Sequence, residues 1–121
     1  MTKTDKDIVN SFNEERKLLN ELVLKHGGQV TKRFFSLDTQ TYQEGALPAK
    51  TKELIGLVAS LVLRCDDCIK YHLNQCHLHG VTTPELIEAI ETGLIVGGSI
   101  TIPHIRRTIE FWEALNDQDR K

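Results

Sequence analysis

Two cysteines and a histidine form the most chemically suggestive group in the sequence. Cys65 and Cys68 make a Cys-x-x-Cys motif, and His72 follows four residues after the second cysteine. On a helix, residues three and four apart lie on one face, so each member of the group is within reach of the next. A thiol in the first turn of a helix meets the positive end of the helix dipole, which favours the nucleophilic thiolate. The second thiol can then resolve a sulfenic acid or mixed disulfide into an internal disulfide.

Metal binding is the main alternative for this group. A Cys-x-x-Cys pair is also half of a zinc site, and Cys65, Cys68, His72 and Cys76 follow one stripe of a helix. Along the helix axis the first and last of them are roughly 16 Å apart, whereas zinc lies about 2.0–2.3 Å from each ligand. All four therefore cannot share one ion, and only a partial site without Cys76 stays open. We favour redox chemistry, and we expect Cys76 to be a small core residue.

A carboxylate, Glu53, opens the apolar run from Leu54 to Leu63. It is either an exposed first-turn acid that suits the helix dipole or a buried proton acceptor near the thiols. In a simple antiparallel helix hairpin with its turn at Arg64, Glu53 would face residues near Cys76 instead of Cys68. Glu53 therefore reaches the thiols only if the two helices cross at a steep angle.

The composition is that of one ordinary globular domain, residues 1–121. Charged residues make up 26% of the chain and the formal net charge is −2, so the basic footprint of a nucleic-acid-binding protein is missing. The longest apolar-rich run has ten residues, whereas a membrane span needs roughly 20. The first ten residues lack the apolar core of a secretory signal, and three cysteines do not suit a disulfide scaffold. We expect a cytoplasmic protein without nucleic-acid or membrane partners.

The elements that must position these residues all read as helices, because strand patterns are nearly missing. We expect six, over about 5–25, 30–43, from 48, 65–79, from 82 and 103–116. Thr4 and Thr82 are the expected caps of two of them, and Pro48 is expected at the first helical position of the third. Phe111 lies about 100° off the apolar stripe of the last helix. We therefore expect it at the surface of a lone chain, where it indicates a subunit contact.

The spacing of the candidate residues resembles the alkylhydroperoxidase D-like members of the carboxymuconolactone decarboxylase family. Glu53 stands twelve positions before Cys65 of the Cys65-x-x-Cys68 motif, and His72 stands four positions after its end. The flanking segments agree, with Gly-Ala-Leu-Pro-Ala-Lys-Thr-Lys-Glu-Leu-Ile before the motif and His-Gly-Val-Thr followed by Pro-Glu-Leu-Ile after it. The resemblance covers residues 45–115 well and the first 44 residues loosely.

The resemblance implies an all-α fold, a compact bundle of about six helices that assembles into homo-trimers or homo-hexamers. It implies an antioxidant enzyme that reduces peroxides or disulfides without a metal, haem or flavin cofactor. A thiol reductant or a redox partner protein would regenerate the pair. In such enzymes the second cysteine meets the peroxide, so Cys68 would be peroxidatic and Cys65 resolving. Glu53 and His72 would form the proton relay.

The sequence departs from well-known peroxidase members at one position. Those members have a histidine directly before the second cysteine, where this chain has Asp67, preceded by Asp66. Two carboxylates beside the thiols oppose thiolate formation by like-charge repulsion, and Arg64 partly offsets them. The helix-dipole argument also makes Cys65 the more acidic thiol, so the residues and the resemblance differ on which thiol attacks first.

Two other functions stay open at this point. One is a decarboxylase-like lyase that acts on a small carboxylated lactone, which would work unchanged with both thiols blocked. The other is a non-catalytic module in which the thiols bind zinc or merely pack. A reversible disulfide between Cys65 and Cys68 would favour the oxidoreductase, and stoichiometric metal would favour the module.

Overall fold

The computed structural model describes residues 4–119, which form six α-helices and one short 3-10 helix and contain no strand. The elements are α1 (Asp5–His26), α2 (Gln29–Thr41), α3 (Ala49–Val62), α4 (Asp66–Leu78), α5 (Thr83–Gly97), η1 (Ser99–Thr101) and α6 (Ile102–Asp119). The predicted all-α fold of six helices is confirmed.

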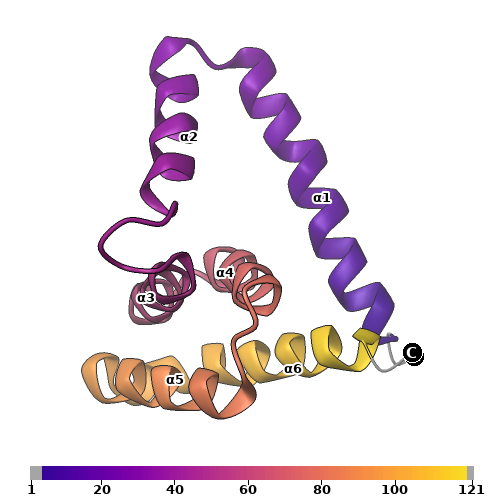
Figure 1. The fold of residues 1–121 in the computed structure, drawn as a ribbon. Helices are drawn as coiled ribbons and strands as arrows, with labels where there is room; N and C mark the ends of the chain where they lie inside the picture. The colour runs from indigo at the N-terminus through magenta and orange to yellow at the C-terminus, as the bar shows by residue number, and fades with distance from the viewer. Residues whose placement is uncertain (1–3, 120–121) are drawn as a thin grey trace.

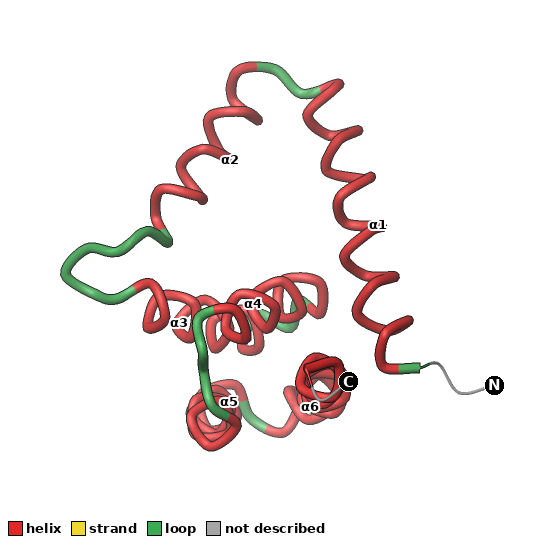
Figure 2. The backbone as a smooth tube through the Cα atoms, turned by 45° about the vertical axis from the view of Figure 1, so that its right-hand side comes forward, coloured by secondary structure: helices red, strands yellow, loops and turns green. Residues whose placement is uncertain are grey.

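Four helices, α3 to α6, and the first half of α1 build the core. α3 packs against α4 and α5, and α6 packs against α4 and the first half of α1 (Figures 1 and 2). Fully buried side chains fill the space between them, among them Leu57 and Leu61 of α3, Leu73 of α4 and Trp112 of α6. As a result, α3 and α4 lie side by side along their length, and a residue of one can contact the other well away from the connecting turn.

Capping residues explain where the helices begin. The Thr4 side chain accepts the N–H of Asp7 at the start of α1, and Thr82 with Glu85 forms a reciprocal capping box at the start of α5. Both caps were predicted. Pro48 is the residue before α3 instead of its first helical residue, because its ψ of 151° is extended.

The turn from α3 to α4 places an arginine where glycine is usual. α3 and α4 end in the same way, since the two residues after each helix donate their N–H groups to carbonyls of its last turn. This pattern needs one residue in the left-handed region, and φ is 60° at Arg64 after α3 and 76° at Gly80 after α4. Glycine adopts that conformation freely, whereas the left-handed conformation costs any other residue roughly 1–2 kcal/mol. The turn leads directly into Cys65.

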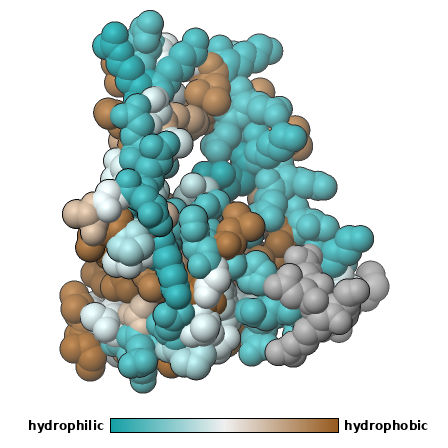
Figure 3. All heavy atoms as spheres, viewed as in Figure 1, coloured by the Kyte–Doolittle hydropathy of each residue, from teal (hydrophilic) through white to brown (hydrophobic). Residues whose placement is uncertain are grey.

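α1 and α2 form a hairpin that extends away from the other helices (Figures 1 and 2). Only the first half of α1 contributes to the core, through Ile8, Val9 and Phe12, and no residue of α2 is buried. Beyond that first half of α1, most large apolar side chains of the hairpin are exposed: Leu18, Leu19, Leu22, Val23, Leu24, Val30, Phe34 and Leu37. On the face shown in Figure 3, apolar side chains occur in patches along this hairpin and also gather over α3 and α5. The predicted apolar stripe of the first helix is therefore split between core and surface.

The prediction that Phe111 is exposed is wrong. The side chain is 1% exposed, because α6 is covered on one side by α4 and on another by α1. Phe12 of α1 meets it edge to face with ring centroids 5.7 Å apart, and the ammonium of Lys70 lies 5.9 Å from its ring. Phe111 is thus a core residue of the single chain.

Candidate active site

Cys65 and Cys68 lie at the N-terminus of α4 and form a disulfide, with their Cα atoms 5.3 Å apart. Cys65 is the N-cap residue, and its Sγ accepts the backbone N–H of Cys68 at 3.3 Å. This amide and the helix N-terminus stabilise negative charge on the Cys65 sulfur once the disulfide is reduced. Cys68 is the exposed member of the pair, whereas Cys65 is partly buried. An external reagent therefore meets Cys68 first.

Asp66, between the two cysteines, is held by α6. Its carboxylate accepts the Nδ1–H of His104 at 2.7 Å and the Nε–H of Arg107 at 2.9 Å. Burial acts to raise the pKa of the Asp66 carboxyl, but these two hydrogen bonds outweigh it and lower that pKa. One of the two charges expected to oppose thiolate formation, that of Asp66, is thus offset by partners from a distant helix. Sequence reasoning did not connect either partner with the Cys-x-x-Cys motif.

Glu53 and His72 form a buried pair between α3 and α4. Their exposed fractions are 3% and 7%, so the interpretation of Glu53 as an exposed first-turn acid is wrong. The Nδ1–H of His72 donates to Oε1 of Glu53 at 2.8 Å. A carboxylate at Nδ1 fixes the proton there and leaves Nε2 as the basic nitrogen of the neutral ring.

Glu53 contacts the imidazole instead of the thiols of the Cys-x-x-Cys motif. Its charge also reaches Cys76, where burial first and then Glu53 raise the pKa of the thiol to about 12. Cys76 is fully buried in the core, as predicted. α3 and α4 therefore run as the simple hairpin that sequence reasoning considered. Glu53 faces the end of α4 near Cys76 and still meets His72, which lies one turn before it.

Tyr42, the C-cap residue of α2, lies against the same imidazole, and sequence reasoning missed it. Its hydroxyl oxygen is 3.4 Å from Nε2 of His72, and the ring centroids are 5.2 Å apart. Burial first, and then the charges of Asp38 and Glu53, raise the pKa of Tyr42. No spacing pattern links residue 42 with residue 72, so the sequence carried no signal for this contact.

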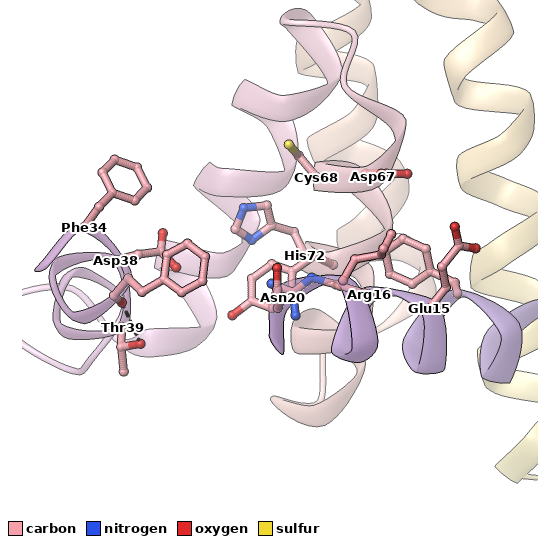
Figure 4. A pocket seen from close by; sticks show the side chains of 13 residues that line it. Glu15, Arg16, Asn20, Phe34, Asp38, Thr39, Asp67, Cys68 and His72 are labelled. Atoms are coloured by element: carbon pink, nitrogen blue, oxygen red, sulfur yellow. Dashed lines mark hydrogen bonds between the residues drawn. The ribbon is translucent and has the colours of Figure 1, made fainter. Parts of the chain in front are cut away.

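A cavity of about 640 Å³ opens beside Cys68 and His72, between α1, α2 and α4. In Figure 4, residues of α2 lie on one side of it and residues of α1 on another, with Cys68, Asp67 and His72 on α4. Its apolar and aromatic lining consists of Phe12, Leu19, Phe34, Phe35 and Tyr71. Its charged lining consists of Glu15, Arg16, Asp38 and Asp67. The guanidinium of Arg16 lies 4.1 Å from the centre of the Tyr71 ring.

The possible metal ligands are spread out. Within residues 4–117, no three or more His, Cys, Asp and Glu side chains are grouped so that they could hold a metal ion. Over the same range, no helix combines the length and apolar character needed to cross a membrane.

The fold of this chain has counterparts among solved structures. A Thermotoga maritima protein is 54% identical, with a TM-score of 0.89 over 91% of this chain and 96% of that chain. A second Thermotoga maritima structure, at 53% identity and a TM-score of 0.87, covers 91% and 93%. It is described as a carboxymuconolactone decarboxylase family protein with a suggested role in an antioxidative response. A family protein from Legionella pneumophila, at 24% identity and a TM-score of 0.82 over 90% and 97%, shares the fold.

Two further relatives are similar in sequence. An uncharacterized protein of Cupriavidus necator is 32% identical over 74 residues, which are 61% of this chain and 66% of that protein. An uncharacterized protein of the cox locus of Paracoccus denitrificans is 31% identical over 90 residues, which are 74% and 81% of the two chains. The sequence model of one family matches residues 28–110, a range that includes Glu53, both cysteines of the motif and His72. The chain belongs to the carboxymuconolactone decarboxylase family.

Proposed function

We propose that this protein is a thiol-dependent antioxidant oxidoreductase that reduces peroxides or disulfides through Cys65 and Cys68. The observation that carries the proposal is a disulfide whose exposed member, Cys68, lines a cavity together with His72. A purely structural disulfide has no need for a buried Glu53–His72 pair one turn away.

In the oxidising half of the cycle Cys68 attacks. His72 takes the thiol proton at Nε2, and the Cys68 sulfur bonds to one oxygen of the peroxide while the O–O bond breaks. The proton passes to the departing alkoxide, which leaves as an alcohol, and Cys68 becomes a sulfenic acid. The Cys65 thiol then attacks that sulfur, water leaves, and the disulfide of the present structure forms.

In the reducing half the same geometry works in reverse. An external thiolate attacks the exposed sulfur of Cys68 and Cys65 leaves as a thiolate, which the N-terminus of α4 stabilises. A second external thiol then releases a small disulfide and restores the Cys68 thiol. This assignment reconciles the two arguments from the sequence, since the more acidic thiol is the leaving group and the more exposed one is the point of attack. The reductant is a small thiol or a redox partner protein, and we propose that the cycle runs in the reducing cytoplasm.

Charge at the cavity favours an uncharged substrate. Three carboxylates, those of Glu15, Asp38 and Asp67, line the cavity with one guanidinium, that of Arg16. A carboxylated lactone, the substrate of a lyase, would be repelled by this excess of acids. A neutral hydroperoxide that carries an apolar group suits both the charge and the aromatic lining.

A homo-oligomer, either a trimer or a hexamer, is the second part of the proposal. A helix of 13 residues that buries no side chain is not stable by itself in water. Eight large apolar side chains of α1 and α2 are exposed, and neighbouring exposed apolar side chains of this kind are typical of an interaction surface. Packing of these helices against other copies of the chain would cover them.

Mass spectrometry of the intact protein tests the oxidoreductase directly. The reduced protein is treated with one equivalent of an organic hydroperoxide, and both the protein mass and the alcohol product are measured. We expect the protein to lose two hydrogens as one alcohol forms, with Cys65 and Cys68 linked. Retained stoichiometric zinc, or lactone turnover that continues after both thiols are blocked, would overturn the proposal.

A further inference from the structure

The imidazole of His72 is contacted at both nitrogens, and the second contact has no role in the cycle described so far. Because Nδ1 donates to Glu53 at 2.8 Å, the neutral ring presents a lone pair at Nε2. The Tyr42 hydroxyl, 3.4 Å from Nε2, is therefore the donor of that contact. The raised pKa of Tyr42 keeps its proton in place at neutral pH.

The backbone around Tyr42 is held by a lysine of α3. The ammonium of Lys52 donates to the carbonyl oxygen of Thr41 at 3.0 Å and to that of Gln43 at 2.7 Å. These carbonyls flank Tyr42 on both sides, at the end of α2, where helix carbonyls have no partner within the helix. A cation is also favourable at a helix C-terminus. α2 ends at Thr41, two residues before the predicted end, at the first of these two contacts.

A glycine of α3 makes room for the contact between the two rings. A Cβ at Gly56 would lie 2.6 Å from Cε1 of His72 and 2.7 Å from the Tyr42 hydroxyl. Three residues within two turns of α3 thus act on the two rings. Lys52 holds the backbone at Tyr42, and Glu53 accepts the hydrogen bond from Nδ1 of His72. Gly56 leaves the space in which the rings meet. The three features converge on a single orientation of the imidazole.

We infer that Tyr42 is a positioning residue of this site, whose hydroxyl, held in place by Lys52, donates to Nε2 of His72 and fixes the imidazole beside Cys68. The inference rests on the proposed function, in which His72 is the base for the thiol. With Glu53 at one nitrogen and Tyr42 at the other, the ring is fixed in its plane before the Cys68 proton arrives.

Tyr42→Phe tests this inference, because it removes the hydroxyl and keeps the ring. One hydrogen bond of this kind corresponds to a loss of about 2- to 10-fold in rate. We expect that loss in kcat for an organic hydroperoxide, with KM little changed, since the cavity lining is intact. Thr92→Val removes an exposed hydroxyl on α5 and is the control for loss of a hydroxyl far from the site.

Lys52→Met is the second variant. It removes the ammonium that holds the backbone on both sides of Tyr42 and leaves the Tyr42 side chain unchanged. We expect the same direction of change in kcat as for Tyr42→Phe, and little further loss in the double variant, because the two act through one contact. Lys50→Met is the matched control. That lysine lies two positions earlier on α3 and pairs with Glu85 instead.

Nitrogen NMR of His72 in the oxidised, full-length protein gives a readout that does not depend on turnover. We expect a protonated Nδ1 and a hydrogen-bonded Nε2 in the unaltered protein, and an Nε2 signal that moves toward that of a bare imidazole nitrogen in Tyr42→Phe. An identical Nε2 signal in both proteins would overturn the inference. If no form of the protein reduces peroxide, the proposed function fails, while this spectrum still decides the role of Tyr42.

Discussion

Replacing Gly56 by alanine adds a single methyl group at the point where α3, Tyr42 and His72 meet. The new Cβ would lie 2.6 Å from Cε1 and 2.8 Å from Nε2 of the imidazole, and 2.7 Å from the Tyr42 hydroxyl. Ordinary contacts of a Cβ begin at 3.4 Å. The imidazole therefore has to retreat by almost 1 Å, or the Tyr42 ring and α3 have to move apart by a similar amount.

The same change has opposing effects on stability and a single effect on catalysis. Alanine is favoured over glycine within a helix by about 1 kcal/mol, while overpacking a buried position costs about 1–3 kcal/mol. The net loss of stability is therefore at most about 2 kcal/mol, which a folded domain usually tolerates. A misplacement of about 1 Å in a catalytic group lowers the rate about 10²-fold. We expect Gly56→Ala to fold and to lose about that factor in kcat.

Peroxide turnover with a dithiol reductant and thermal unfolding, measured on the same preparations, separate the two effects. Gly93→Ala is the matched control, because Gly93 is also a buried helical glycine and the three atoms nearest to its added Cβ would be side-chain carbons of α3, the closest at 2.9 Å. We expect Gly93→Ala to be destabilised to a similar extent and to keep its turnover. A Gly56→Ala protein with an unchanged rate would refute the claim that the orientation of His72 matters to the reaction.

Four further outcomes are expected. Cys65→Ser and Cys68→Ser should each abolish multiple turnovers in a peroxide assay, whereas Cys76→Ser should keep most of the activity. Loss of turnover in Cys76→Ser alone would mean that the redox pair is misassigned. His72→Ala should lower turnover by about 10²–10⁴-fold, and Glu53→Gln should lower it by a similar or smaller factor. The double variant should lose little more than the worse single variant, and additive losses would show that the two residues do not act as a unit. Because burial and then Glu53 raise the pKa of Cys76 to about 12, its thiol keeps its proton, and iodoacetamide should not modify it in the folded protein at pH 8–9, as peptide mapping would detect. Sedimentation at micromolar concentration should give a trimer or a hexamer, and a monomer would contradict the proposed packing of α1 and α2.

The local signals in the sequence predicted the helices and their caps well. Threonine caps, a proline and glycines at helix ends act within one turn, so the order and approximate bounds of all six helices follow from short segments of chain. The spacing of Glu53, the Cys-x-x-Cys motif and His72 likewise lies within two adjacent helices. Their side-by-side packing brings Glu53 and His72 together once the turn at Arg64 is formed.

The parts that could not be predicted all depend on which helix lies against which. Phe111 is off the apolar stripe of α6, yet it is buried because α1 crosses back over it, and an amphipathic pattern does not specify a second neighbour. The contacts of Asp66 with His104 and of Tyr42 with His72 join residues 38 and 30 positions apart. No periodicity in the chain encodes such pairs, so only the packed structure shows them.

The left-handed residue at the end of α3 makes position 64 a place where two selective pressures oppose each other. A cation here, one residue before the first redox sulfur, favours the thiolate, whereas the backbone with φ at 60° favours glycine. β-Branched residues would satisfy neither demand. Variation at this site is therefore expected to divide homologues into those that retain the charge at some expense of stability and those that carry glycine or asparagine. Arg64→Gly would be among the more stable single substitutions in this protein, at the expense of thiol reactivity.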